Sequence, residues 1–363
     1  MISLSCLGGH VEIHSGGPLS GGPFPRFTPN QWTSPCTRSL RGATKCAPTN
    51  YDPPVRTKEL AHRTLLRTFP VTKVRGIRRV WGKAQYVALT KWGSESVETE
   101  LHGSPATINF ANPYPYLTRL HPNYNAPQVE LVATSADVLG RPVTVIDIGA
   151  AIGDTALLLL QRCGPAIRAL ECIEGEPAFA EMLRQNLQDP RSHIHEVVLS
   201  DRPGPVPSLI RSQHEGTASA HGDELVTAST LDVELADISP DVMKVDTDGF
   251  DGIILAGGKE LLERAHPAVL FEWHPPLCKL VGADPQLAFE VLREAGYDRW
   301  VFFTKYGWFS HFGDACVDQL ERLCLTTKTL PDWHYDVVAL HRSSNIDEVA
   351  LADLRHWGSS GYP

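Results

Sequence analysis

The chain lacks several features that mark specialised classes of protein. No run of about 18 apolar residues occurs among its 363 residues, so no membrane-spanning helix is expected. No basic start precedes an apolar block at the N-terminus, which argues against a secretory signal peptide. The eight cysteines include no CxxC pair, which excludes zinc-ribbon spacing and favours reduced thiols. We therefore expect a cytoplasmic protein.

Acidic residues are scarce in the N-terminal part of the chain. Residues 1–142 hold 16 Lys and Arg against 8 Asp and Glu, whereas the remainder holds 17 against 34. Most of the positive excess lies in residues 56–83, where nine basic residues face only Glu59. Such a stretch can meet nucleic acid, an acidic carrier or a phosphorylated substrate, but a solvated helix face is the commoner reason for it. No RNA-binding signature accompanies it, so nucleic acid is not favoured as a partner.

Regular periodicity is absent from residues 1–54, which carry seven Gly and eight Pro. This composition predicts a flexible tail over residues 1–55. Residues 56–125 are predicted to form a small α+β segment, a candidate substrate cap. Its expected elements are a helix over 59–69, strands over 84–90, 97–102 and 106–110, and an irregular segment over 113–127.

From residue 143 onward, short apolar strands alternate with amphipathic helices, which predicts an α/β domain with a parallel sheet and helices on both faces. We assign residues 126–345 to this domain and 346–363 to a C-terminal tail. The expected strands cover 143–148, 167–173, 193–199, 242–246, 268–273, 300–303 and 335–340, and the expected helices 154–163, 177–187, 251–264 and 285–295. Ligands of such sheets bind at the carboxyl ends of the strands, so the residues that follow each strand are candidate site residues.

The first strand ends in a glycine turn, Asp147-Ile148-Gly149-Ala150-Ala151-Ile152-Gly153. Its glycines let a ligand approach the backbone and the N-terminus of the next helix. The turn is not the GxGxxG of dinucleotide-binding proteins, and Asp147 would repel a pyrophosphate. Asp147 suits the ammonium group of an amino acid, such as the methionine part of S-adenosylmethionine (SAM). The N-terminus of the next helix can bind the carboxylate of the same part. A tight turn without a ligand is the alternative.

Two further acids follow the second and third strands. Glu174 lies 21 residues after Gly153, close to the spacing at which an acid reaches ribose hydroxyls. Asp201 stands where an adenine amino group could be met, or in a plain turn. We count both as candidate cofactor-binding residues.

The fourth and fifth strands carry the candidate catalytic residues. Lys244 and Asp246 share a face of an extended strand, which brings Asp246 to the strand end with a cation behind it. Asp248 and Asp251 also fit the N-cap and N3 positions of the next helix. Glu272 and His274 point the same way, and His274 is a candidate base near neutral pH, with a structural histidine as the alternative.

Five motifs in this order resemble the FkbM-type SAM-dependent methyltransferases over roughly residues 113–340. They are VIDIGAAIGDT, ECIEGEPAFAEMLRQNL, STLD, MKVDTDGFDGIILAGG and LFEWHP. The resemblance implies a Rossmann-like class I methyltransferase fold with a seven-stranded sheet, and SAM as cofactor. It implies that Asp147, Gly149 and Gly153 hold the methionine end of SAM, that Glu174 holds the ribose, and that Asp246 lies beside the methyl group. Ala151, counted with the cofactor-binding turn, stands where that family often has Asn.

The expected reaction is O-methylation of a small-molecule acceptor, a sugar or natural product, with Asp246 or His274 as the base that takes the hydroxyl proton. Asp246, Asp248, Glu272 and His274 could hold a divalent metal, which the sequence does not demand. No membrane partner is expected.

Four other interpretations of the function stay open. The same fold could methylate the nitrogen of a peptide or amine. Asp246 and Asp248, with Gly313, Asp314 and Asp318, imitate the acids of haloacid-dehalogenase-like phosphatases. A nicotinamide-dependent oxidoreductase and a non-catalytic SAM-binding module are less favoured. The aromatic side chains of Tyr306, Trp308 and Phe309 could border the site of the acceptor, or they could simply pack against the rest of the protein.

Overall fold

The computed structural model describes residues 57–69, 75–211, 218–313, 317–329 and 333–359, so the predicted tail over 1–55 lies outside the described residues. The chain divides into two units, Met1–Asp52 and Pro53–Pro363, and every described residue belongs to the second. None of the helices in the described part combines the length and apolar character needed to cross a bilayer.

A mixed sheet of eight strands forms the centre of the fold, in the order β11-β10-β12-β9-β8-β3-β4-β5. The strands are β3 (Val143–Ile148), β4 (Ile167–Glu174), β5 (Ser192–Glu196), β8 (Val242–Val245), β9 (Ala268–Trp273), β10 (Tyr297–Thr304), β11 (Phe309–Gly313) and β12 (Tyr335–His341). The five strands from β9 to β5 are parallel, and β12, β10 and β11 are antiparallel. The expected α/β fold class is confirmed, and all seven predicted strands are present.

The sheet differs from the prediction at its antiparallel end. The eighth strand, β11, was not predicted because its side chains are exposed or half-buried, so no buried apolar run marks it. The prediction of a wholly parallel sheet is wrong for β10 to β12, which form an antiparallel edge of the kind common in large α/β sheets.

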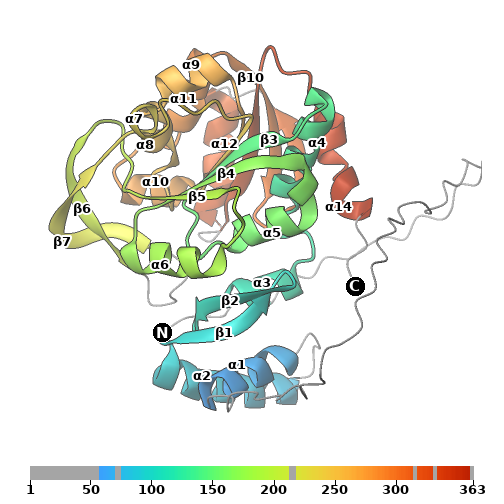
Figure 1. Ribbon diagram of the computed structural model, residues 1–363, viewed down its shortest axis with the longest axis vertical. Coiled ribbons are helices and arrows are strands. Elements are labelled where there is room, and N and C mark those ends of the chain that lie inside the picture. Colours follow the sequence, from blue (N-terminus) through green and yellow to red (C-terminus); the bar gives the residue numbers. More distant parts are fainter. Residues whose placement is uncertain (1–56, 70–74, 212–217, 314–316, 330–332, 360–363) are drawn as a thin grey trace, which may run out of the picture. The chain divides into compact units, whose positions relative to one another are not determined.

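Helices cover both faces of the sheet and enclose two hydrophobic cores (Figure 1). The first core contains residues from α4 (Ala126–Leu139), α5 (Asp154–Cys163) and α6 (Pro177–Asn186). The second contains residues from α8 (Asp251–Ala256), α9 (Lys259–Ala265) and α11 (Leu287–Glu294). Val145 packs into the first core and Ile146 into the second, as the alternation of side chains along a strand requires.

Three local predictions are corrected. The predicted strand over 84–90 belongs to α2 (Arg75–Trp92), because Trp81, Gln85, Ala88 and Trp92 turn inward at helical spacing. The irregular segment over 113–127 contains α3 (Tyr114–Leu120) and the start of α4. The helix over 251–264 is two helices, α8 and α9. They break at Gly257, where a Cβ would lie 2.2 Å from the Ser200 carbonyl oxygen.

Between β5 and β8, where no strand was predicted, lies an antiparallel hairpin, β6 (Gly204–Arg211) and β7 (Ala218–Ala228). Four further short or late elements were not predicted. They are α7 (Leu231–Glu234), α10 (Pro275–Leu280), α12 (Val317–Thr329) and the 3-10 turn Gly164–Ala166.

The segment ahead of the sheet begins with α1 (Thr57–Arg67), as predicted, and continues through α2 into the hairpin β1 (Ser96–Leu101) and β2 (Ser104–Asn109). Asn186 on α6 ties this hairpin to the sheet domain. Its Nδ2 donates to the carbonyl oxygens of Thr107 and Ile152, each at 2.8 Å. The hairpin is therefore held against the glycine turn that contains Ile152.

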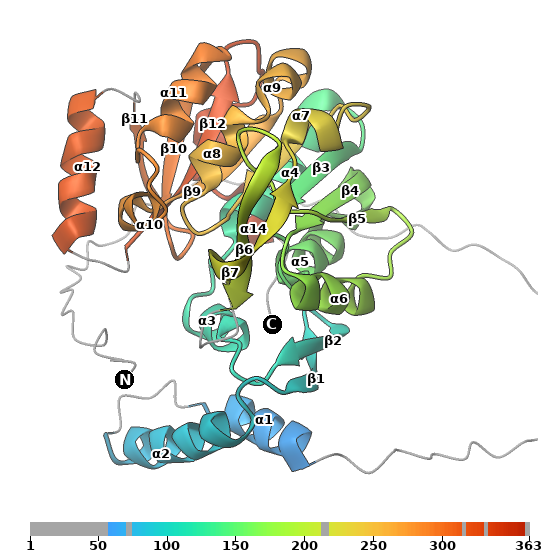
Figure 2. The same ribbon diagram turned by 90° about the vertical axis from the view of Figure 1, so that its left-hand side faces the viewer.

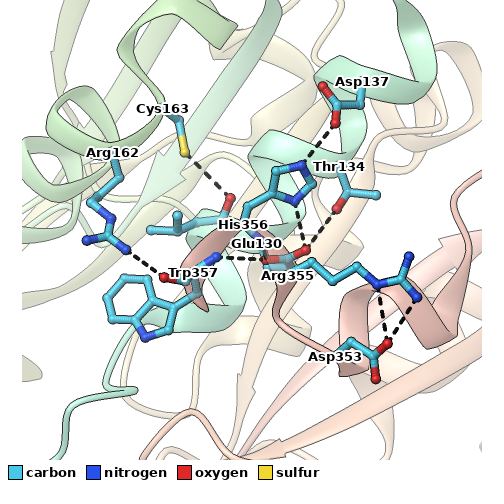
Figure 3. Close-up of polar contacts among 10 residues, drawn as sticks. Glu130, Thr134, Asp137, Arg162, Cys163, Asp353, Arg355, His356 and Trp357 are labelled. Carbon is cyan, nitrogen blue, oxygen red and sulfur yellow. Dashed lines mark hydrogen bonds and ion pairs between the residues drawn. The ribbon is translucent and has the colours of Figure 1, made fainter. Parts of the chain in front are cut away.

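The last helices, α13 (Glu348–Ala352) and α14 (Arg355–Ser359), lie in the predicted C-terminal tail and dock on α4. The buried carboxylate of Glu130 accepts hydrogen bonds from the backbone N–H groups of His356 and Trp357, at 2.8 and 3.2 Å (Figure 3). His356 also places its ring nitrogens 2.8 Å from Glu130 and 2.9 Å from Asp137. The predicted domain boundaries stay predictions.

Candidate functional site

A cavity of about 640 Å³ opens at the carboxyl ends of β3, β4, β8 and β9. Two tyrosines and Asn125 border it from the segment before α4, and Val206, Pro207 and Leu209 border it from β6. Its polar and charged lining residues include Tyr114, Tyr124, Asn125, Asp154, Thr155, Glu174, Ser200, Lys244, Asp246, Asp248, Glu272, His274 and His334. The cavity thus lies where parallel α/β sheets bind ligands.

The glycine turn after β3 forms one wall of the cavity. Gly149 has φ 76°, and a Cβ there would lie 2.0 Å from the backbone oxygen of Asp246. Gly153 has φ 85° and precedes α5, and a Cβ there would lie 2.8 Å from a methyl carbon of Leu183. Both positions therefore require glycine for conformation and for space. Ala151 also has a left-handed φ, 46°, a region that Asn tolerates better than Ala does.

Glu174 ends β4 and lines the cavity, as the sequence led us to expect of a ribose-binding acid. Its two carboxylate oxygens accept hydrogen bonds from the backbone N–H groups of Ala151, at 2.8 Å, and Glu176, at 2.7 Å. These bonds fix the side chain and leave further lone pairs for a ligand. Burial raises the pKa of Glu174 to about 7, despite the two backbone donors.

Asp147 does not border the cavity, contrary to its predicted role at the lip of β3. It is fully buried, and its Oδ1 lies 2.9 Å from Nζ of Lys244. Burial alone would lower the pKa of Lys244, but the charges of Asp147 and Asp246 outweigh it and raise that pKa. Asp147 is thus committed to a buried ion pair, since residues 147 and 244 are neighbours across the parallel strands β3 and β8.

Asp154, the first residue of α5, is the acid of this segment that lines the cavity. Its Oδ1 accepts a hydrogen bond from the backbone N–H of Thr155 at 2.8 Å. Burial raises the pKa of Asp154 to about 6. The sequence did not single out this residue because an acid at a helix start has an ordinary explanation in the helix dipole.

Asp246 follows β8 and enters the cavity, with its side chain 43% exposed and its Oδ2 3.4 Å from Nζ of Lys244. Asp248 also lines the cavity at φ 51°, and burial with the charges of Asp246 and Glu174 raises its pKa to about 7. The N-cap prediction for Asp248 is wrong, because Phe250 occupies the N-cap of α8. Asp251 is buried and accepts from Thr247 Oγ1 at 3.2 Å.

His274 lines the cavity and caps α10 with its ring. Its Nδ1 accepts a hydrogen bond from the backbone N–H of Leu277 at 3.3 Å. A neutral imidazole has one donor and one acceptor nitrogen, so the cap leaves the ring proton on Nε2. The ring therefore offers a donor at Nε2, whereas a base would need a free lone pair there.

His334, before β12, is a second histidine of the cavity, and no sequence pattern indicated it. Its Nε2 lies 3.4 Å from Oε2 of Glu272. Burial, with Lys305 and His274 nearby, lowers the pKa of His334 to about 3. Burial and the charges of Asp246 and Asp248 raise the pKa of Glu272 well above its ordinary value.

Tyr124 also borders the cavity and was not predicted as a site residue. Its only signal in the sequence was the Tyr- and Pro-rich segment ahead of the sheet. Burial, followed by the charges of Asp246 and Asp154, raises the pKa of its hydroxyl well above the ordinary value. Tyr124 thus keeps its proton and offers a donor among the acids of the cavity.

Asp201 lies outside the cavity lining, exposed at the surface, and accepts a hydrogen bond from Ser200 Oγ at 3.1 Å. Ser200 itself borders the cavity. The three aromatic residues considered as an acceptor wall do not border it either. Tyr306 stacks on His121 with ring centroids 3.7 Å apart, and Trp308 and Phe309 are exposed.

No three His, Cys, Asp or Glu side chains are arranged to hold a metal ion in the described part of the chain. The four side chains named from the sequence as possible ligands, Asp246, Asp248, Glu272 and His274, all border the cavity.

A family model described as "Methyltransferase FkbM domain" matches residues 147–299. The match begins at the glycine turn and includes the ends of β4, β8 and β9. The resemblance drawn from the sequence motifs is confirmed: residues 147–299 match the FkbM methyltransferase domain.

Solved structures were also compared with the chain. Methyltransferase FkbM from Methylobacillus flagellatus KT is 13% identical with a TM-score of 0.37, and the match covers 77% of this chain and 58% of that one. An O-methyltransferase from Bacillus cereus in complex with SAH is 10% identical with a TM-score of 0.34, covering 60% of this chain and 80% of that one. The chain thus spans little more than half the length of the first. No curated protein matches it in sequence.

Proposed function

We propose that the chain is a SAM-dependent O-methyltransferase that acts on a hydroxyl of a small-molecule acceptor, a sugar or a natural product. The family match supports methyl transfer. The observation that carries the proposal is that a single cavity brings together three acids: Glu174 from the end of β4, Asp246 from the end of β8, and Asp154 from the start of α5, the helix that follows β3.

The residues that line the cavity fit each part of the methyl donor SAM in turn. Gly149 and the turn after it leave space for close approach to the backbone. Glu174, fixed by two backbone donors, has lone pairs left for the ribose hydroxyls. Asp154 presents a half-buried carboxylate for the ammonium of the methionine part, the role that the sequence predicted for Asp147. The bound donor supplies an electrophilic methyl group on a sulfonium.

Asp246 is proposed as the base. An alcohol is a poor nucleophile near neutral pH, so positioning and proton removal must provide most of the catalysis. In the reaction the acceptor oxygen forms a bond to the methyl carbon, the carbon–sulfur bond breaks, and the hydroxyl proton passes to an Asp246 oxygen. His274, fixed as an Nε2–H donor by its cap on Leu277, orients the acceptor oxygen instead of taking its proton.

Nitrogen methylation of an amine is the second candidate. Asp248 and Glu272, which border the same cavity as Asp246, would attract a cationic acceptor. The acceptor panel described next separates the two candidates.

Methyl transfer from methyl-labelled SAM to sugars, glycosides and amines tests the proposal. Asp246→Asn is expected to lower kcat by about a hundredfold or more for a hydroxyl acceptor, with the affinity for S-adenosylhomocysteine (SAH) little changed. Asp353→Asn, at an exposed acid paired with Arg355 on the far C-terminal segment, is the matched control and should leave kcat unchanged. Transfer to amines alone, or full activity of Asp246→Asn, would contradict the O-methyltransferase assignment.

A further inference from the structure

The outward side of helices α1 and α2 exposes large apolar side chains. Leu60, Val80, Tyr86 and Val87 are 58, 71, 72 and 64% exposed. Val80 and Tyr86 are the two most exposed large apolar side chains of the described residues. A solvated helix face normally carries polar residues at such positions, so solvent alone is a poor explanation for this side of the two helices.

The exposed residues of α2 form a stripe on the side away from the β1–β2 hairpin. The inward side is fixed by Trp81, whose Nε1 donates to the Leu65 carbonyl oxygen at 3.1 Å, and by Trp92, whose ring lies 5.7 Å from Phe110. Val80, Val87 and Lys91 follow at i, i+7 and i+11 on the opposite side. Figure 2 shows α1 and α2 side by side below the hairpin.

We call the exposed apolar and basic residues of these two helices the α1–α2 surface. It consists of Leu60, Arg63, Arg67, Val80, Lys83, Tyr86, Val87 and Lys91.

The α1–α2 surface is also basic. Its cations are the exposed Arg63, Arg67, Lys83 and Lys91, whereas Glu59, the acid of α1, is only 7% exposed. The described parts of α1 and α2 therefore present cations without an exposed acid between them. Residues 143–363 carry twice as many acids as bases, so positive charge is concentrated on this segment.

We propose that the α1–α2 surface binds the anionic face of a lipid bilayer. Lys83 and Lys91 flank Val87, one helical turn away on either side. Long cationic side chains beside aliphatic ones suit an interface at which the aliphatic groups enter the acyl boundary and the ammonium groups stay among lipid phosphates. Nucleic acid would meet the cations but gains nothing from exposed valines, which neither stack on bases nor donate to phosphates.

Flotation of the full chain with lipid vesicles tests the proposal. The chain should float with phosphatidylcholine vesicles that contain about one third phosphatidylglycerol, and about tenfold less with phosphatidylcholine alone. Salt at about 0.5 M should release most of it, because it screens the cations. Val80→Ser combined with Val87→Ser should abolish flotation. Val233→Ser, at a valine of α7 that is 60% exposed, is the matched control and should not change it.

A charge variant completes the test. Lys83→Gln combined with Lys91→Gln should reduce binding at least tenfold, whereas Lys259→Gln, at an exposed lysine of α9, should leave it unchanged. The melting temperature of each variant checks that it folds. Absence of flotation with anionic vesicles overturns the proposal, and so does flotation that the serine double variant retains. Binding to an oligonucleotide or an acidic protein in place of vesicles also overturns it, in favour of that partner.

Discussion

Lys244 on β8 and Asp147 on β3 form a buried ion pair, with the ammonium nitrogen 2.9 Å from the carboxylate oxygen. Lys244 borders the cavity, and its ammonium also lies 3.4 Å from Asp246, which enters the cavity. Asp147, the acid of the glycine-turn motif, thus contacts the lysine that contacts Asp246.

Removal of either member of this pair is expected to destabilise the protein strongly. Lys244→Met leaves Asp147 charged and buried without a partner, a loss of about 3–5 kcal/mol in the free energy of unfolding. Lys244→Met combined with Asp147→Leu removes both charges and should recover much of that loss. Chemical denaturation of the three proteins measures it. A double variant no more stable than Lys244→Met would show that the pair is not the cause.

Substitution of Gly149 is expected to displace Asp246. Gly149→Ala combines a left-handed φ with a methyl carbon only 2.0 Å from the Asp246 carbonyl oxygen, so we expect a loss of about 3 kcal/mol in stability and a large loss of kcat. Gly282 is the matched control, because it has φ 77° but no atom within 4 Å of the place where a Cβ would lie. Gly282→Ala should cost about 1 kcal/mol and leave kcat unchanged. Equal losses in both variants would contradict the steric argument.

One substitution separates the two roles of His274, the cap of α10 and the hydrogen-bond donor in the cavity. Asn at this position can still accept the Leu277 N–H, but it cannot reach the cavity with a donor. His274→Asn should therefore keep nearly wild-type stability and lower kcat by about tenfold to a hundredfold. If His274 were instead the base, the decrease in kcat that wild type shows toward acidic pH would be absent from His274→Asn. An unchanged decrease supports Asp246 as the base.

Stability of the ligand-free protein should fall as pH rises from about 5 to about 8 and should level off above about pH 8. Burial raises the pKa of Asp251 and of Asp336, on β12, to about 8 each, whereas these acids titrate at about 4 in the unfolded chain. Between these two pKa values the folded state holds protons that the unfolded chain has lost, so the stability present below about pH 4 is lost as pH rises to the folded pKa. Each acid contributes a slope of about 1.4 kcal/mol per pH unit in this window, and Asp251→Asn should remove one of the two contributions. Denaturation at several pH values checks this, and stability that rises over the range would contradict it.

Most of the sheet could be predicted from the sequence because buried parallel strands are short, apolar on both faces and bounded by turn residues, as in Val143–Ile148. The edge strand β11 could not, since its side chains are exposed or only half-buried. The 84–90 segment was misassigned because its exposed Val87 imitates the alternation of a strand, and only the inward tryptophans reveal the helical period.

The site residues at strand ends could be predicted from the sequence, whereas those in the connections between elements could not. Glu174 and Asp246 follow buried strands, so topology alone places them at the cavity. Asp147 was misplaced because the side-chain direction within a strand, toward Lys244 on the neighbouring strand, depends on a pairing that the sequence does not state. Tyr124 and His334 arrive from connections between elements, where no periodicity predicts which side chains turn inward.

The central claim, that Asp154 holds the ammonium and Glu174 the ribose of one nucleoside donor, is tested most directly by calorimetry with two ligands. SAH carries the amino-acid part, and 5′-methylthioadenosine lacks it. Asp154→Asn should weaken SAH at least tenfold and leave methylthioadenosine unchanged, whereas Glu174→Gln should weaken both. Equal effects of Asp154→Asn on the two ligands, or wild-type affinity of Glu174→Gln for both, would contradict the account.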